Sequence, residues 1–265
     1  MGPISRILIY PIKSLDGMEV AKIATLPSGA LAGDRRLALV DANGRMLNGK
    51  RSPRVHAIRA VFDGVTVSGE WSGVTLAVAD LGVERFGWSE WDRLAEWLSP
   101  WLGESIRVEE DREVGFPDDL ESPGPTLVST ASLGLVGSWF GLSVEETRRR
   151  FRANIEIAVE NAFDEDRLFG EAGEARPVAI GQPVYCAVNP CQRCVVPTRD
   201  SLTGGSVAGF QKEFARRREA SLPDGVARSR FNHFYRLAVN TRPGDGFRPE
   251  AIRVGDVVGV VGLET

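Results

Sequence analysis

Short runs of alternating or β-branched apolar residues dominate the first half of the chain, and Gly, Pro, Asp and Asn separate them. Runs of this kind predict β-strands. Because the runs are close neighbours in sequence, they favour an antiparallel barrel or sandwich over a parallel sheet, which needs long helical crossovers. Asn43-Gly44 and Asp63-Gly64 predict hairpin turns. The runs lie at residues 4–12, 18–26, 35–47, 56–62, 65–69 and 74–79.

Helical spacing of apolar residues occurs in four segments. A helix is predicted over 90–102 with Ser89 as its N-cap, and another over 129–141 after a Ser/Thr start. Ser143 followed by Glu146 is typical of a capping box and predicts a helix over 143–151. The fourth helix is expected around 207–219. Strands are predicted between and after these helices, at 153–160, 176–181, 183–189, 194–198, 233–241 and 251–262.

The segment from Arg112 to Pro125 is acidic and rich in Pro and Gly, which indicates a connection between two units. We therefore expect domains at residues 1–115 and 116–265. The predicted fold class is α+β and rich in β: an N-terminal antiparallel β-barrel-like domain, then a β-barrel with peripheral helices.

The overall charge of the chain favours a small-molecule site. A formal charge of −4 and a pI near 5.5 argue against nucleic-acid binding, which requires a basic face. No apolar run approaches the roughly 18 residues of a membrane span, and the first residues do not resemble a secretion signal, so we expect a cytoplasmic protein without membrane contact. Of the 32 basic residues 28 are Arg, whose side chain can bind phosphate or carboxylate with two hydrogen bonds.

Cys191 and Cys194 form a Cys-x-x-Cys pair, and the third cysteine is Cys186. Three cysteines do not make a disulfide framework and fit a reducing compartment. A zinc site is disfavoured because only Cys186, His56 and His233 remain to complete four ligands. A thioredoxin-like dithiol is also disfavoured, since Cys194 runs into a predicted strand instead of opening a helix. The plain alternative is two small residues near the end of a strand.

Six motifs in chain order identify a family. The matching segments are Tyr10-Pro11-Ile12-Lys13-Ser14, Gly33-Asp34-Arg35-Arg36, Leu127–Leu133, Phe151-Arg152-Ala153-Asn154-Ile155, Cys191-Gln192-Arg193-Cys194 with Thr198, Asp200 and Thr203-Gly204, and Ile252–Val257. Over nearly its whole length the sequence resembles the MOSC superfamily (molybdenum cofactor sulfurase C-terminal domain) with its companion N-terminal β-barrel domain. Mitochondrial amidoxime reducing components and their bacterial relatives have this arrangement.

The resemblance implies a molybdenum cofactor, which consists of molybdenum on a pyranopterin. Cys194 is the expected metal ligand, because a thiolate is the soft donor that suits molybdenum. Lys13, Arg35 and Arg152 are expected at the pterin phosphate, where Arg and Lys supply fixed positive charge. A hydroxyl from Ser14, an amide from Asn154 and the guanidinium of Arg193 complete the expected cofactor contacts, and Asp200 is the second catalytic candidate.

The leading functional hypothesis is a molybdenum enzyme that reduces N-oxygenated small molecules by removing oxygen at the metal. The chain lacks the four further cysteines of the iron–sulfur domain fused to some relatives, so a separate electron-donor protein carrying flavin, haem or iron–sulfur is expected. The alternative is a carrier that holds the cofactor in transit or holds sulfur as a persulfide on Cys194. A non-enzymatic β-barrel protein is the third possibility. Pyridoxal phosphate binding is implied only at the level of the superfamily.

The sequence departs from the family pattern in two places. Pro197-Thr198 and Asp200-Ser201 replace the usual residues of the cysteine loop, which alters the shape of that loop. The hydroxyl-bearing loop that contacts the cofactor in relatives is expected near Ser122 to Thr126.

Overall fold

The computed structural model describes residues 1–262, and its larger unit is a closed β-barrel. Seven strands follow one another around the barrel, and the last strand pairs again with the first. In order around the barrel they are β10 (Ile155–Ile157), β9 (Leu127–Ser129), β13 (Arg236–Pro243), β12 (Val184–Gln192), β11 (Arg176–Ile180), β15 (Val257–Val260) and β1 (Gly2–Ile9).

Strand β1 closes this barrel although it comes from the start of the chain. It pairs antiparallel with β15, where Gly2 lies opposite Val258, and with β10, where Ile7 lies opposite Ile155. Its other neighbour is β2 (Met18–Val20), while β3 (Lys22–Ala24) pairs with β14 (Ala251–Arg253). The barrel core is apolar because the buried side chains of these strands are mainly Ile, Leu and Val.

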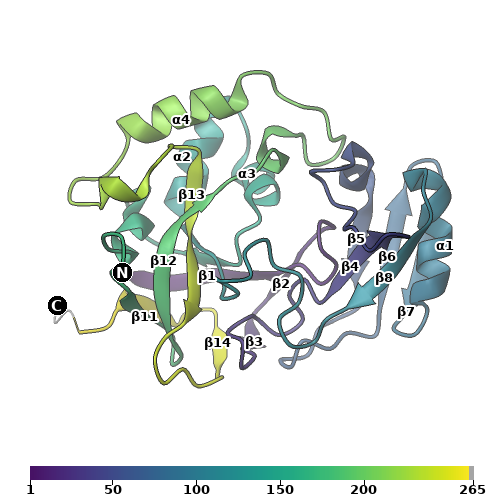
Figure 1. The fold of residues 1–265 in the computed structure, drawn as a ribbon, viewed down its shortest axis with the longest axis horizontal. Coiled ribbons are helices and arrows are strands. Elements are labelled where there is room, and N and C mark those ends of the chain that lie inside the picture. The colour runs from purple at the N-terminus through teal and green to yellow at the C-terminus, as the bar shows by residue number, and fades with distance from the viewer. Residues whose placement is uncertain (263–265) are drawn as a thin grey trace.

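Three helices cover the barrel on one side: α2 (Thr130–Phe140), α3 (Val144–Phe151) and α4 (Phe210–Ala220), which lie together in the upper part of Figure 1. The predicted N-caps Ser129 and Ser143 are confirmed, since each side chain accepts a hydrogen bond from the backbone three residues later. Aromatic rings hold the helices to the barrel, with Phe151, Phe210 and Phe214 all buried.

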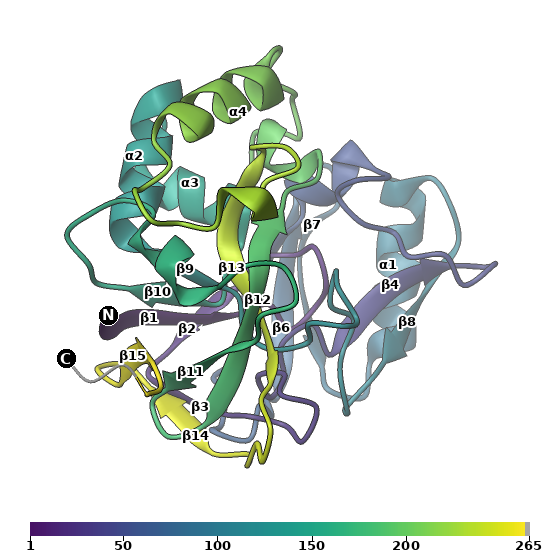
Figure 2. The ribbon, with the colours of Figure 1, turned by 60° about the vertical axis from the view of Figure 1, so that its left-hand side comes forward.

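The smaller unit lies at the other end of the molecule from α4 (Figures 1 and 2). In it β4 (Leu37–Asp41) pairs with β8 (Ile106–Glu110), and a three-stranded sheet forms from β5 (Arg59–Phe62), β6 (Gly73–Val78) and β7 (Gly82–Gly87). Helix α1 (Trp91–Leu102) buries Leu94, Ala95, Leu98 and Leu102 against these strands. Short 3₁₀ turns occupy Pro53–Ala57, Asp164–Leu168, Val196–Thr198 and Arg228–Arg230.

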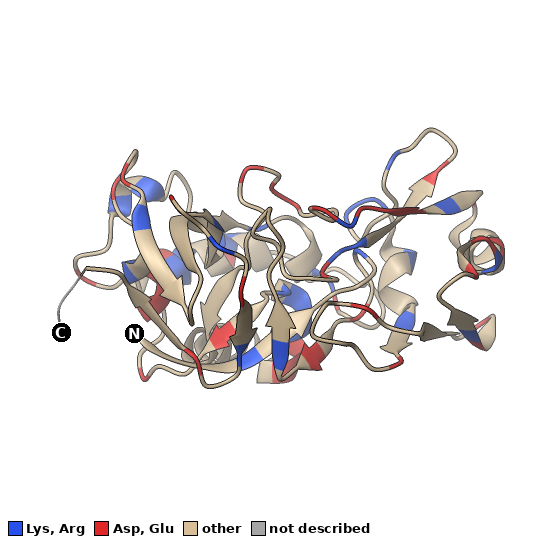
Figure 3. Cartoon of the chain, turned by 90° about the horizontal axis from the view of Figure 1, so that it is seen from below, with Lys and Arg blue, Asp and Glu red and all other residues tan. Residues whose placement is uncertain are grey.

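The β-rich, two-unit fold class predicted from the sequence is confirmed. Within the described residues 1–262, no helix has the length and apolar character needed to span a membrane. Figure 3 shows that positive and negative residues are interspersed along the whole molecule.

Three local predictions were wrong. Residues 65–69 form a loop instead of a strand, because the carbonyl of Val67 accepts a hydrogen bond from Ala24 and Gly69 packs on the backbone of Ala32. Residues 194–198 form a 3₁₀ turn instead of a strand, with Pro197 in its first turn, where a missing N–H costs nothing. The N-cap of α1 is Glu90, one residue after the predicted Ser89.

Candidate functional site

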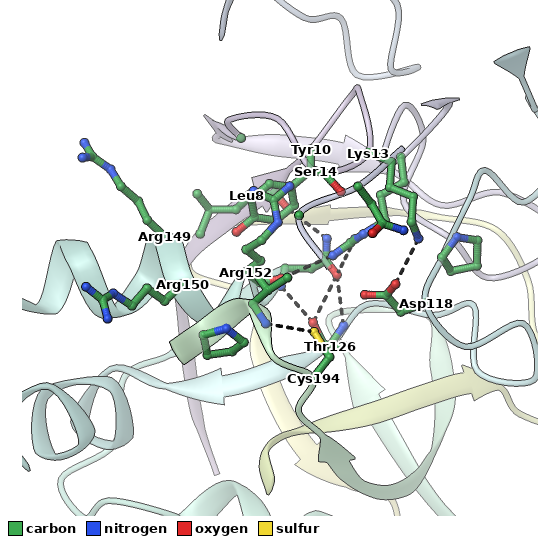
Figure 4. A pocket seen from close by; sticks show the side chains of 18 of the residues that line it. Leu8, Tyr10, Lys13, Ser14, Asp118, Thr126, Arg149, Arg150, Arg152 and Cys194 are labelled. Atoms are coloured by element: carbon green, nitrogen blue, oxygen red, sulfur yellow. Dashed lines mark hydrogen bonds and ion pairs between the residues drawn. The ribbon is translucent and has the colours of Figure 1, made fainter. Parts of the chain in front are cut away.

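A cavity of about 810 Å³ lies between the two units and takes its lining from both. From the first part of the chain it receives Lys13, Ser14 and Arg35. From the barrel and α3 it receives the other predicted cofactor residues, namely Arg152, Asn154, Arg193 and Cys194. Figure 4 shows Lys13, Ser14, Arg152 and Cys194 gathered around the same space. The structure therefore brings seven of the eight predicted site residues to one cavity.

Three of these residues have backbone that an L-amino acid rarely adopts. The φ angles of Ser14, Arg35 and Arg152 are 73°, 48° and 53°, all in the left-handed region. Only two other non-glycine residues within 1–262, Phe163 and Ala238, share this property. Left-handed backbone costs on the order of 1–3 kcal/mol and is concentrated at functional sites. The cavity is thus lined by three of the five non-glycine residues with left-handed backbone in residues 1–262.

The buried ring of Tyr10 contacts two of the guanidinium groups. The guanidinium carbon of Arg152 lies 4.1 Å from the ring centroid and that of Arg35 lies 5.1 Å from it. The hydroxyl of Tyr10 donates to the carbonyl of Ala153 at 3.2 Å, and burial raises its pKa to about 12. Tyr10 therefore stays neutral and fixes two cations by cation–π contact.

The charges of Arg35 and Arg152 are balanced differently. Burial disfavours the charged form of Arg35, but the carboxylate of Asp34, which it contacts, together with Asp118 and Tyr10 raises its pKa. Burial and the nearby charge of Arg35 lower the pKa of Arg152. Arg152 has no carboxylate partner within residues 1–262, and its Nη2 is buried without a hydrogen bond. An uncompensated buried guanidinium is costly unless a ligand anion approaches it.

Lys13 is buried and held by the loop that joins the two units. Its Nζ donates to the carbonyl of Phe116 at 2.6 Å and to Oδ1 of Asp118 at 3.1 Å. Burial lowers the pKa of Lys13. Burial opposes ionisation of Asp118 as well, but Lys13 and Lys50, whose Nζ is 3.2 Å from the same oxygen, keep its pKa well below the usual range.

The connecting segment is part of the site. Ser122, Pro123, Gly124 and Thr126 line the cavity, in the region expected to carry a hydroxyl-bearing loop.

Cys194 lies just after the end of β12, and its Sγ accepts a hydrogen bond from the backbone N–H of Val196 at 3.4 Å. Cys191 also lines the cavity, and Nη1 of Arg193 is 3.1 Å from its Sγ. Burial opposes the charge of Arg193, but Cys191, Cys194, Tyr235 and Asp118 together raise its pKa. The other amino group of Arg193 donates to the carbonyl of Phe151, while its Nε is buried and unpartnered.

Asn154 is 2% exposed and its amide is already used by the protein. Its Oδ1 accepts from the backbone and hydroxyl of Thr126 at 3.3 and 3.2 Å and from Arg35 at 3.5 Å. Its Nδ2 donates to the carbonyl of Leu8 at 3.1 Å. In this structure Asn154 ties β1, the Thr126 segment and Arg35 together, and it positions the cavity wall.

Asp200 is the one predicted site residue that does not line the cavity. Its Oδ1 accepts hydrogen bonds from the backbone of Leu202 and from the backbone and hydroxyl of Thr203, at 2.9–3.1 Å. Its other oxygen lies 3.5 Å from Arg150. These contacts organise the loop after Cys194.

Tyr10, Asp34 and Arg199 lie within the matching motifs, but the sequence assigned no role to them. His56 was considered only as a zinc ligand and Arg59 lies in no motif, so only the fold reveals that both line the cavity.

The chemistry of the lining suits an anionic ligand. Eleven Lys or Arg residues line the cavity against five Asp or Glu residues, in a chain whose net charge is −4. Within the described part of the chain, the two predicted cofactor arginines Arg152 and Arg193 have no carboxylate partner, and each keeps one buried nitrogen without a hydrogen bond. A group that combines a phosphate with a thiolate-seeking metal therefore fits the residues present.

Comparison with known proteins agrees in both halves of the chain. The MOSC N-terminal beta barrel domain matches residues 1–105, and the MOSC domain matches residues 126–259. Among curated proteins, the molybdenum cofactor sulfurase of Drosophila grimshawi is 27% identical over 269 residues, covering 91% of this chain and 34% of the sulfurase. The mitochondrial amidoxime reducing component 2 of Homo sapiens is 23% identical over 241 residues, covering 77% of this chain and 68% of that protein.

The chain spans about a third of the length of the sulfurases it matches. Among solved structures, the YuaD protein of Bacillus subtilis aligns over 97% of this chain and 93% of its own, with a TM-score of 0.41 and 10% identity.

Proposed function

This chain belongs to the MOSC domain family, with a MOSC N-terminal β-barrel domain before the MOSC domain, and we propose that its inter-unit cavity binds a molybdenum cofactor. The observation that carries the proposal is the buried guanidinium of Arg152, which has left-handed backbone and an unpartnered nitrogen and lines the same cavity as Cys194. Backbone strain and an unsatisfied buried cation both cost folding free energy, and a bound phosphate would offset them.

In this proposal the chain's own residues divide the work. Arg152 and Arg35, held by Tyr10, bind the phosphate together with Lys13 and Ser14. Arg193 would contact the cofactor beside Cys194, and the Cys194 thiolate would be the ligand that holds the metal. The bound cofactor supplies the two-electron redox chemistry at molybdenum.

We propose further that the protein reduces N-oxygenated small molecules with electrons from a separate donor protein. Relatives named as amidoxime reducing components support this activity, at 22–25% identity. The protein's contribution is to orient the substrate in the cavity beside Cys194 and to exclude competing reactions with solvent.

The test is the molybdenum and pterin content of protein purified from a host that makes the cofactor, together with reduction of benzamidoxime. Cys194→Ser should abolish reductase activity. Cys191→Ser is the matched control because it changes a cavity thiol three residues away and should leave most of the activity. Equal losses in the two variants would replace the single-ligand assignment by a dithiol mechanism.

A carrier function is the second candidate, and the sulfurase relatives, which align over as much as 91% of the chain, favour it. In that case Cys194 would hold persulfide sulfur or a cofactor in transit. Persulfide sulfur without molybdenum in the purified protein would support the carrier, whereas stoichiometric molybdenum together with benzamidoxime reduction would support the reductase.

A further inference from the structure

Positive charge lies on both sides of Arg152 in the cavity lining, and we refer to the Lys13 side and the α3 side as the two ends of the lining. Lys13 and Asp118 lie on one side of Arg152 in Figure 4, and Arg149 and Arg150 lie on the opposite side. The phosphate site proposed above uses Lys13, Arg35 and Arg152. The positive charge at the α3 end has no part in that proposal.

Three arginines at this second end converge on the loop that follows Cys194. Nη2 of Arg59 donates to the carbonyl of Ser201 at 3.1 Å, and Nη1 of Arg199 donates to the carbonyl of Gly204 at 3.4 Å. Nη2 of Arg150 lies 3.5 Å from Oδ2 of Asp200. We call Arg59, Arg150 and Arg199 the arginine cluster; all three line the cavity.

The arginine cluster is built from both units of the molecule. Arg59 begins β5 of the smaller unit, Arg150 lies in α3, and Arg199 ends the 3₁₀ turn after Cys194. Glu146 links them, because it accepts from Nε of Arg150 at 2.6 Å and from the backbone and hydroxyl of Ser201 at 3.1 and 2.5 Å.

Each arginine of the cluster keeps one nitrogen unsatisfied. Nε of Arg59, Nη1 of Arg150 and Nε of Arg199 are buried and have no hydrogen-bond partner. The side chain of Arg150 is only 3% exposed. Asp16 pairs with Arg59 at 3.1 Å and Glu146 pairs with Arg150, but Arg199 has no carboxylate within reach in residues 1–262. Buried donors of this kind require an acceptor, and the oxygens of an anion can supply one.

The rim beside the cluster is apolar and open to solvent. Val61 is 68% exposed and Leu202 is 48% exposed, and both line the cavity. A ligand that enters here meets apolar side chains and then the guanidinium groups.

We propose that the arginine cluster is a substrate subsite that binds a carboxylate or phosphate carried by an N-oxygenated substrate with an apolar or aromatic body. This inference rests on the proposed reductase function and deepens it, because it assigns the class of substrate. The anion anchors the substrate at the α3 end of the cavity while its N–O group reaches toward Cys194.

The test compares benzamidoxime with 4-carboxybenzamidoxime in the molybdenum-loaded protein. The wild type should have a higher kcat/KM for the carboxylated compound. Arg199→Gln should lower that kcat/KM about tenfold, which is typical of a lost charge-assisted hydrogen bond, and should leave benzamidoxime reduction and molybdenum content unchanged. Arg199→Lys should recover part of the loss. Arg54→Gln is the matched control, since Arg54 is exposed, bonds only to the carbonyl of Trp101 and does not line the cavity.

Benzoate binding measured by calorimetry makes the same comparison without turnover. Benzoate should bind about tenfold more weakly to Arg199→Gln than to the wild type, while benzamide should bind equally to both. This result is expected even if the protein shows no reductase activity. Equal benzoate affinity in the wild type and Arg199→Gln would overturn the subsite, as would a parallel loss on both amidoximes. A nucleotide released with the pterin on acid treatment would also overturn it, because the cluster would then hold an extension of the cofactor. Absence of molybdenum and of all activity would refute the reductase and leave the benzoate result to decide the subsite.

Discussion

At the scale of single residues, Arg152 combines two unfavourable features in one position. Its backbone is left-handed, and its side chain is a buried cation with an unpartnered nitrogen. It is also the C-cap of α3, a position where glycine is the usual residue. A residue that lowers stability on two counts is retained most readily where it binds a ligand.

Arg152→Gly should therefore separate stability from function. The free energy of unfolding of the cofactor-free protein should stay equal or rise, because glycine adopts φ 53° without strain and removes a buried charge. Retention of molybdenum should fall roughly tenfold or more, as expected for loss of a charge-assisted contact of about 1.5–3 kcal/mol. Urea unfolding and metal analysis after dialysis measure the two effects. Arg216→Gln, on the exposed surface of α4, is the control. A destabilised variant that keeps its molybdenum would show that Arg152 is structural.

His56 should make the protein less stable in acid. Burial lowers its pKa, and the charges of Arg199, Arg152 and Arg59 lower it further. Since the unfolded chain then binds a proton more readily than the folded one, stability is complete above the ordinary pKa of about 6.5 and falls as pH decreases through it. In His56→Gln the free energy of unfolding should decrease less between pH 7 and pH 5 than in the wild type. Identical pH profiles would mean that His56 titrates alike in both states.

Site residues that lie in sequence motifs could be predicted from the sequence, whereas residues that only the fold brings to the cavity could not. Lys13, Arg35, Arg152 and Cys194 lie in four separate motifs, and all line one cavity. Arg199, in contrast, lies between Thr198 and Asp200 of the cysteine loop, but nothing in that motif assigns it a role. Its position depends on where the loop after Cys194 meets α3 and β5, which is a tertiary property.

At the scale of elements, two glycines join the loop between β5 and β6 to the segment that precedes Arg35. Gly33 and Gly69 have φ angles of 78° and 75°, and their backbones are in contact. A Cβ on Gly69 would lie 2.4 Å from the carbonyl carbon of Ala32, closer than real Cβ atoms come to another heavy atom.

Gly69→Ala should destabilise the protein more than Gly82→Ala. Both residues have left-handed backbone, so each substitution carries a conformational cost of roughly 1–2 kcal/mol. Gly82 has open space where a Cβ would be added, whereas Gly69 would also clash, adding about 1–3 kcal/mol. Chemical denaturation measures both. The clash would also displace Asp34 and Arg35, so Gly69→Ala should lose molybdenum more readily. Equal destabilisation by the two substitutions would mean that the loop between β5 and β6 moves to accommodate the Cβ added by Gly69→Ala at no cost in free energy.

Helices were predicted better than turns for a physical reason. The caps Ser129 and Ser143 act through bonds within three residues, so the local sequence contains the whole interaction. The strand expected at 194–198 failed because valines favour strands only where a neighbouring strand is present. Here Pro197 and the contact with α3 favour a 3₁₀ turn.

At the scale of the whole molecule, strand β1 belongs to the barrel although strands β4 to β8, which come later in the chain, form the other unit. Its backbone bonds run from Ile4 to Asp256 and from Leu8 to Asn154. A fragment that starts near residue 117 lacks this strand, and the barrel could not close. Poor cofactor binding by such a fragment would therefore reveal nothing about the role of Lys13 or Arg35.

Hydrogen exchange should show that β1 unfolds with the barrel. Leu98→Ala, in the buried face of α1, should destabilise the smaller unit by about 2–5 kcal/mol. Amides of β4 and β8 should then exchange faster, while those of Ile4 and Leu8 keep the protection of β10 and β15. Faster exchange of Ile4 and Leu8 in step with β4 would make the two units one cooperative structure.

The closure of the barrel by β1 also sets an order of events during synthesis. Gly2 pairs with Val258, so β1 is synthesised before β15, and this edge of β1 stays uncovered until β15 has been made. The core of the smaller unit, drawn from residues 12–106, can form while translation continues. Contacts that span most of a chain slow folding and leave a strand edge exposed in the meantime. This protein should therefore fold in two stages, with barrel closure as the slow one.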